Sequence, residues 1–129
     1  MNAARAYART QHETASKERL MVLLFEAALK HIRAGAAALE EGKKQGAVAP
    51  LTRAGEIVSE LSATLDATRA PELAQVLKDV YLFVSGRLLR AAAVGQAEAA
   101  REAERAFAPI VEAFAQVVAQ QGAPPEVSR

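Results

Sequence analysis

Apolar side chains recur at intervals of three and four residues along most of this chain, and that spacing restricts the fold more than any other feature. It places apolar residues on one face of an α-helix, whereas a strand needs strict alternation. Alanine, leucine, glutamate and arginine are abundant, while β-branched and aromatic residues are few, which also favours helix. We therefore expect an all-α protein without a sheet.

Glycine and proline interrupt this pattern and divide the chain into four helices. Proline suits the first turn of a helix, where its missing N–H group costs no hydrogen bond, and glycine often follows the end of a helix. The first and third helices should end at Gly42 and Gly95, with a short connection at 42–46. The four predicted helices start near Ser16, at or just before Pro50, at Pro71 and near Gln96.

Such short connections force neighbouring long helices to pack antiparallel, which predicts an up-down four-helix bundle. Pro109 lies inside the fourth helix and removes the hydrogen bond to the carbonyl of Arg105, so we expect a kink there. The length of 129 residues fits a single domain. Within it we expect a flexible N-terminal arm, the bundle and a disordered tail, over residues 1–15, 16–121 and 122–129.

The composition argues against several classes of function. The chain has no cysteine, and its net charge of +1 comes from interleaved acidic and basic residues, which makes a poor surface for nucleic acid. His12 and His31 have no second metal-type ligand at helical spacing, so no metal site is predicted. No group of residues combines a nucleophile, a base and an orienting side chain. We expect neither an enzyme nor a bound cofactor.

Membrane insertion and secretion are not expected from the apolar runs. The longest strongly apolar run, residues 20–25, is far shorter than the ~18 residues that a membrane span needs. The first dozen residues lack the apolar stretch of a secretory signal. The sequence therefore predicts a cytoplasmic protein without membrane contact.

Two runs, residues 20–25 and 80–84, are apolar on every side of their helices. A helix at the edge of a bundle needs only one apolar stripe about 100° wide, so part of each run should face outwards. In the alternative interpretation, the third helix is central and its neighbours surround it. Exposed apolar grooves between helices accept amphipathic helices of other proteins. We therefore predict a protein that binds a helical partner.

A series of motifs also follows a known order along the chain. The motifs are Tyr7, TASKERL at 14–20, LFEAAL at 24–29, IVSEL at 57–61, YLFV at 81–84, and Arg87 with Leu88. This series resembles the FliS family of flagellar secretion chaperones over most of the chain. Lys17 stands where the family usually has proline, and Phe25 where it usually has tyrosine. Both differences leave the helical pattern intact.

The resemblance implies an export chaperone for flagellin. Such a chaperone binds the disordered C-terminal segment of flagellin, orders it as helices, prevents its premature polymerisation and assists its delivery to the export apparatus. Its expected partners are the C-terminal helices of flagellin and the export-gate protein. The residues expected to contact the partner, in a groove and in the arm, are Tyr7, Leu20, Leu24, Phe25, Ile57, Leu61, Tyr81, Phe83 and Leu88.

Two other functions remain as alternatives. In the first, the protein is a non-catalytic homo-oligomeric scaffold, and the same apolar faces pair with a second copy. In the second, which ranks last, the bundle carries an enzymatic site or a cofactor. The sequence leaves open whether the free protein is a monomer or a homodimer.

Overall fold

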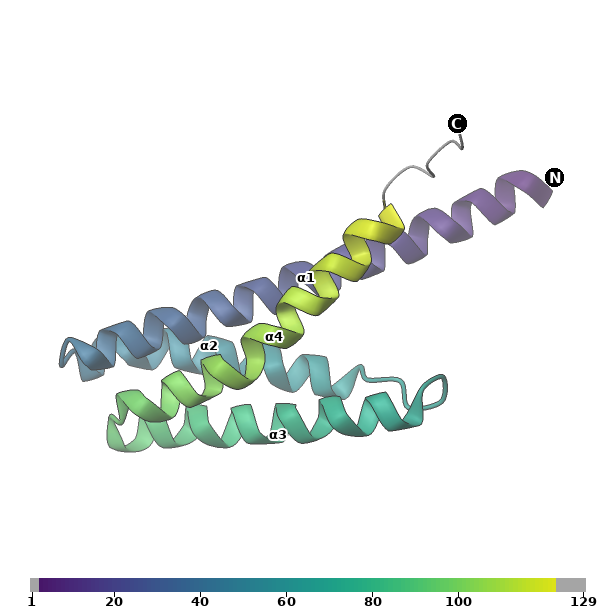
Figure 1. Cartoon of the computed structure of the whole chain (residues 1–129). Coiled ribbons are helices and arrows are strands. Elements are labelled where there is room, and N and C mark those ends of the chain that lie inside the picture. The colour runs from purple at the N-terminus through teal and green to yellow at the C-terminus, as the bar shows by residue number, and fades with distance from the viewer. Residues whose placement is uncertain (1–2, 123–129) are drawn as a thin grey trace.

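The structure, a computed structural model, describes residues 3–122, and the side chains of residues 7–15, 121 and 122 lie outside that description. Within the described part, every regular element is an α-helix (Figure 1). The all-α prediction is therefore confirmed. The helices are α1 (Ala3–Glu40), α2 (Lys44–Ala63), α3 (Pro71–Val94) and α4 (Ala97–Gly122).

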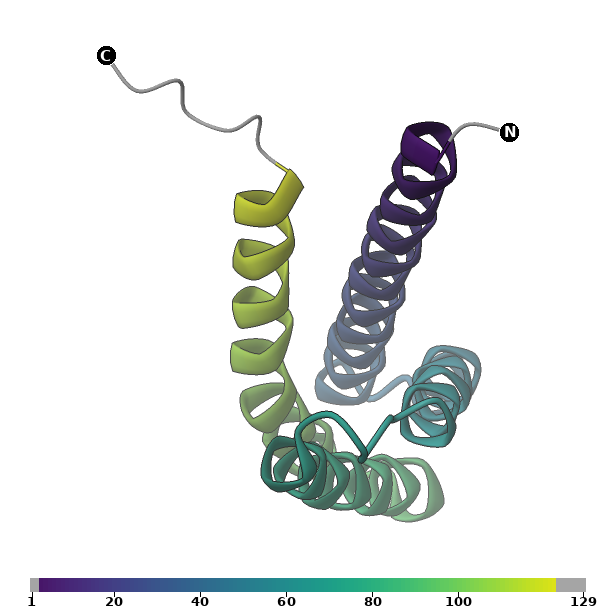
Figure 2. The same cartoon turned by 90° about the vertical axis from the view of Figure 1, so that its right-hand side faces the viewer.

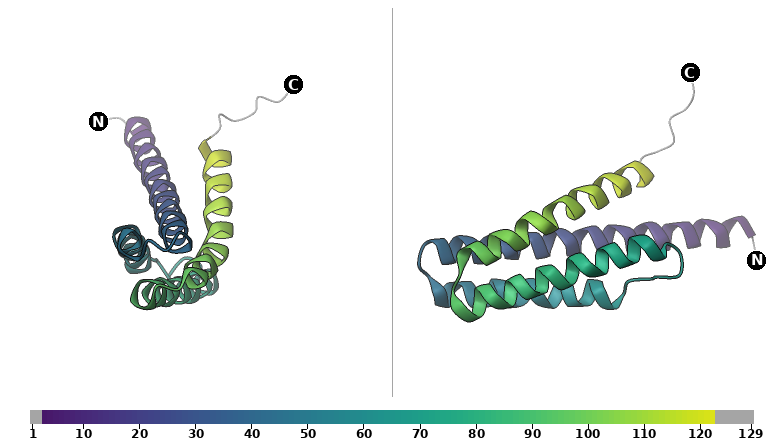
Figure 3. Two further views of the ribbon diagram at one scale, coloured as in Figure 1. Left: turned by 90° about the vertical axis from the view of Figure 1, so that its left-hand side faces the viewer. Right: turned by 60° about the horizontal axis from the view of Figure 1, so that its bottom comes forward.

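The four helices form an antiparallel bundle. Each helix packs against its neighbour along the chain, and α1 also packs against α4, which closes the ring. The two views of Figure 3 show α2 and α3 side by side, with α1 and α4 rising from them on the same side of the molecule. The predicted up-down arrangement is confirmed.

The first helix begins earlier than the sequence pattern indicated. It continues back to Ala3, well before the start predicted near Ser16. Residues 3–15 contain neither glycine nor proline and are rich in alanine, so nothing in them ends a helix. The flexibility of the predicted arm stays a prediction. Of the predicted tail at 122–129, only Gly122 is described, and it ends α4.

The turn after α1 is shorter than the predicted connection. The N–H group of Lys43 donates to the carbonyl of Ala38 at 2.8 Å, and that of Gly42 donates to Leu39 at 3.0 Å. This pair of bonds is a Schellman motif, and it requires the left-handed backbone that Gly42 adopts at φ 77°. Because the turn is complete at residue 43, α2 starts at Lys44 and Pro50 lies inside it. The predicted start near Pro50 was therefore wrong.

The later boundaries agree with the prediction. Pro71 occupies the first turn of α3, and Gly95 follows its end with a left-handed φ of 69°. Pro109 lies inside α4. Figure 2 shows α4 curving so that its C-terminal half leaves α3. The kink at Pro109 itself stays a prediction.

The core contains a cluster of aromatic rings and many alanines. Phe25 and Phe107 are both fully buried, and their ring centroids lie 5.7 Å apart. Phe114 also packs against Phe25, with a centroid distance of 4.8 Å. Tilted aromatic pairs at this distance are favourable beyond the area that they bury. Alanines allow the helices to approach closely around this cluster, among them Ala28, Ala36, Ala54, Ala91, Ala100 and Ala103.

One end of the α1–α4 interface is held by charge. Arg101 of α4 contacts Glu40 of α1 at 2.7 Å and Glu104 at 2.9 Å, and Arg33 of α1 contacts Glu104 at 2.7 Å. Partial burial would raise the pKa of Glu104, but the hydrogen bonds from Arg33 and Arg101 outweigh it and lower that pKa. The hydrogen bond from Arg101 likewise lowers the pKa of Glu40. We call these four residues the charged clamp.

We expect acidic pH to remove the contribution of the charged clamp to the free energy of unfolding. A carboxylate with a lowered pKa in the folded state stabilises the fold above its unfolded pKa, and this contribution disappears as the pH falls through the folded pKa. The free energy of unfolding of the wild type should therefore exceed that of Arg101→Met near neutral pH, and the difference should shrink below the ordinary glutamate pKa of 4.5. Urea titrations at several pH values measure this. A difference that stays constant with pH contradicts it.

A second prediction concerns the close contact between α1 and α2 at Gly35. A Cβ atom on Gly35 would lie 2.6 Å from Cγ of Leu51, which is itself buried. Alanine favours a helix over glycine by about 1 kcal/mol, but overpacking a core costs about 1–3 kcal/mol. We expect Gly35→Ala to lower the free energy of unfolding by roughly 1 kcal/mol, the difference between these two effects.

Gly86→Ala is the matched control for this substitution. Gly86 lies inside α3, and a Cβ atom there would meet nothing within 4 Å. We expect Gly86→Ala to raise the free energy of unfolding by up to about 1 kcal/mol. Urea denaturation of both variants measures the contrast. If both substitutions stabilise the fold equally, Leu51 accommodates the methyl group and the contact does not limit helix packing.

Candidate functional site

Each of the two fully apolar runs is divided between the core and the surface. In α1, Leu20 and Leu23 are 57% and 61% exposed. In α3, Leu82 and Phe83 are 65% and 48% exposed. Since α3 contacts α2 and α4 but leaves these side chains uncovered, the interpretation of α3 as a surrounded central helix is wrong. Both helices carry more apolar surface than the fold buries.

The residues predicted to contact a partner differ in how far the fold buries them. Leu20 and Phe83 are exposed, and Leu24 is partly buried against the core. Leu88 is buried but lines a groove. The side chain of Tyr7 lies outside the described residues. The remaining four are core residues in this conformation, namely Phe25, Ile57, Leu61 and Tyr81.

The buried residues among these share the inward stripe of their helices. Ile57 and Leu61 repeat at four-residue spacing along the face of α2 that meets the bundle. Burial raises the pKa of the Tyr81 hydroxyl to about 12, so it stays protonated over the physiological range. A partner that approaches this conformation from outside cannot reach these four side chains.

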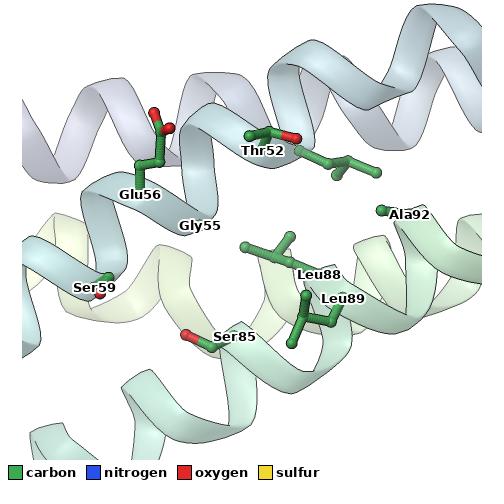
Figure 4. Close-up of a pocket in the computed structure, with 9 residues that line it drawn as sticks. Thr52, Gly55, Glu56, Ser59, Ser85, Leu88, Leu89 and Ala92 are labelled. Carbon is green, nitrogen blue, oxygen red and sulfur yellow. The ribbon is translucent and has the colours of Figure 1, made fainter.

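A groove of about 570 Å³ lies between α2 and α3. Figure 4 shows Thr52, Gly55, Glu56 and Ser59 of α2 on one side of it. Both walls follow helical spacing, so the groove runs along the two helices. The lining residues are Leu51, Thr52, Gly55, Glu56, Ser59, Ser85, Leu88, Leu89 and Ala92. We call this the α2/α3 groove.

Small side chains create the α2/α3 groove. Gly55 has nothing within 4 Å of the place where a Cβ atom would be, and Ser59, Ser85 and Ala92 leave further room. Most of its exposed lining surface is apolar, and Leu89 is 72% exposed. Sequence reasoning missed most of these residues because it sought large apolar side chains. The sequence feature that could have located the groove is a row of small residues on each helix, at positions 52, 55 and 59 of α2 and at positions 85 and 92 of α3.

The α2/α3 groove carries little charge. Glu56 is the one charged side chain among its lining residues. It pairs with Arg53 at 3.4 Å, with both side chains more than half exposed. Exposed pairs of this kind contribute little to stability, so Glu56 remains available to a partner.

A smaller opening lies at the other side of the bundle. It has a volume of about 250 Å³, and Met21 of α1 faces Phe114 and Val117 of α4 across it. Its lining is also mainly apolar, and Glu18 is the charged residue that lines it. This opening lies beyond the aromatic cluster, where α4 has left α3 (Figure 2).

The described residues offer apolar binding surfaces. Within residues 3–122, no three histidine, aspartate or glutamate side chains cluster closely enough to hold a metal ion. None of the described helices is both long and apolar enough to cross a membrane. The arrangement can bury the apolar side chains of another molecule.

Comparison with known proteins agrees with the motif series. The model of a protein family described as flagellar protein FliS matches residues 1–121. No curated protein matches the chain. The match covers far more than half of the 129 residues and all four helices. The chain therefore belongs to the FliS family, whose general role is that of a flagellar export chaperone.

Proposed function

We propose that this protein binds the disordered C-terminal segment of flagellin as a helix in the α2/α3 groove. It thereby prevents premature polymerisation of flagellin in the cytoplasm and assists its delivery to the export-gate protein. The observation that carries this proposal is an open apolar groove, about 570 Å³ in volume, on a member of a flagellar export chaperone family.

The shape and chemistry of the groove favour a helical occupant. A helix satisfies its own backbone hydrogen bonds, so it can lie in a groove that offers few donors and acceptors. On the α3 side, Leu88, Leu89 and Ala92 present apolar atoms, and Ser85 is the polar exception among the lining residues. An amphipathic helix would place its apolar face on α3, and its polar border would meet Thr52 and Glu56 on α2.

A disordered client suits a chaperone that must release its cargo. Ordering the client as a helix uses part of the interaction free energy, so a large contact surface gives only moderate affinity. The exposed leucines, Leu82 and Leu89, provide apolar area that a client would cover. Such binding needs no nucleotide or covalent step.

We expect Gly55→Leu to block the groove without harming the fold. Leucine is a better helix former than glycine, and its side chain has open space at this position. The substitution should weaken binding of a peptide from the flagellin C-terminus at least tenfold, as measured by calorimetry, because the peptide and the leucine would compete for the same volume. Circular dichroism monitors the helix content of the variant.

Gly86→Leu is the matched control. Gly86 also has open space around it and lies in α3, but it does not line the groove. This variant should bind the peptide as the wild type does. If Gly55→Leu binds normally, the client uses another surface. If the wild type does not bind the peptide at tens of micromolar, the proposed client is wrong.

A further inference from the structure

A small pocket lies beyond one end of the α2/α3 groove, next to the connection between α2 and α3. It has a volume of about 160 Å³, far less than the groove. The lining residues are Ser62, Leu65, Ala67, Pro71, Ala74, Gln75 and Lys78. A pocket of this size suits the end of a chain better than a turn of helix. We call it the end pocket.

The end pocket continues the α2/α3 groove along the same faces of both helices. On α2, Ser59 of the groove is followed at helical spacing by Ser62 of the pocket. On α3, Ser85 of the groove and Lys78 of the pocket lie seven residues apart, which is two turns or about 10 Å along the axis. The exposed Leu82 lies between them. A helix in the groove would therefore point one of its ends at the pocket.

The chemistry of the end pocket differs from that of the groove. Ser62 and Gln75 contribute polar side chains, and Lys78 is the one charged residue among those that line it. None of the ion pairs between described residues involves Lys78. The pocket thus has a cation without a carboxylate partner in the part of the chain that the structure describes, whereas the charged residue of the groove, Glu56, is acidic.

Three acidic residues lie near the end pocket without lining it. Asp66 accepts hydrogen bonds from the hydroxyl and the N–H group of Thr68 at 2.6 and 2.9 Å, and these bonds lower its pKa. Asp79 accepts a hydrogen bond from Gln75 at 2.9 Å, and Glu72 lies in the first turn of α3. These acids oppose the attraction of an anion from a distance, so an anion gains only from direct contact with the lysine.

We propose that the end pocket binds the C-terminal carboxylate of the flagellin chain whose helix occupies the α2/α3 groove. The carboxylate contacts the ammonium group of Lys78, and the hydroxyl of Ser62 can donate a hydrogen bond to it. Since α2 ends and α3 begins at this pocket, the client helix runs parallel to α2 and antiparallel to α3. This inference rests on the proposed function and adds to it the direction of the client.

The electrostatics of a helix favour this direction. The C-terminal end of a helix carries a partial negative charge, and the terminal carboxylate adds a full one, so both lie near the lysine. A client in the opposite direction would bring the positive end of its helix to Lys78. A carboxylate on a side chain of the client offers the same chemistry as the terminal one, and the first experiment separates the two.

Amidation of the client peptide tests the contact with the chain end. Calorimetry with the full chain at low ionic strength compares a peptide from the flagellin C-terminus that has a free carboxylate with the same peptide that has a terminal amide. The amide should bind about three- to fivefold more weakly, because a charge pair that is partly exposed contributes little. Equal affinities overturn the proposal, including the case in which an acidic side chain occupies the pocket.

Lys78→Gln tests which residue receives the carboxylate. The substitution should weaken binding of the free-carboxylate peptide by the same factor as amidation and leave binding of the amide peptide unchanged, because both changes remove one contact. A variant that still prefers the free carboxylate as strongly as the wild type overturns the proposal. Circular dichroism checks that the helix content is kept.

Lys44→Gln is the matched control for direction. Lys44 lies at the opposite end of α2, where its side chain contacts Gly95 after the end of α3. This variant should distinguish the two peptides as the wild type does. If the distinction is lost in Lys44→Gln and kept in Lys78→Gln, the client runs the other way and the proposal is wrong.

The same titrations separate this inference from the proposed function. A wild type that binds both peptides equally well rejects the end pocket but keeps the client. A wild type that binds neither peptide at tens of micromolar rejects the client, and the end pocket with it.

Discussion

The contact of Phe25 with Phe107 and Phe114 determines how the bundle is arranged. Phe107 precedes Pro109 and Phe114 follows it, so both halves of α4 are anchored on the same α1 side chain. The second anchor directs the C-terminal half of α4 towards α1 and away from α3. The exposure of Leu73 and Val76 on α3 and the opening near Met21 both follow from this one choice of packing partner.

Small side chains have a different effect on each side of α2. Towards α1, the absence of a side chain at Gly35 lets Leu51 approach closely and brings the helices together. Towards α3, Gly55 and Ser59 leave a groove unfilled. Small residues therefore give a tight interface between α1 and α2 and an open groove between α2 and α3.

Sequence reasoning could predict the helices better than the site. Pro71 and Gly95 marked α3 correctly, because both residues act locally on the backbone. Pro50 was misleading, since a turn completed by Gly42 let α2 start before it. For the site, an entirely apolar run could not reveal which of its members face inwards. Phe25 and Tyr81 therefore turned out to be core residues, whereas Phe83 is exposed.

The connectivity of the bundle has a kinetic consequence. Among the described residues, most of the packing joins helices that are neighbours in the chain, and the extensive contact of α1 with α4 joins distant segments. Helical proteins with mostly local contacts fold within microseconds to milliseconds. Docking α4 onto α1 closes the longest stretch of chain and so has the largest loop-closure entropy, and we expect the ring to close after the helical hairpins have formed.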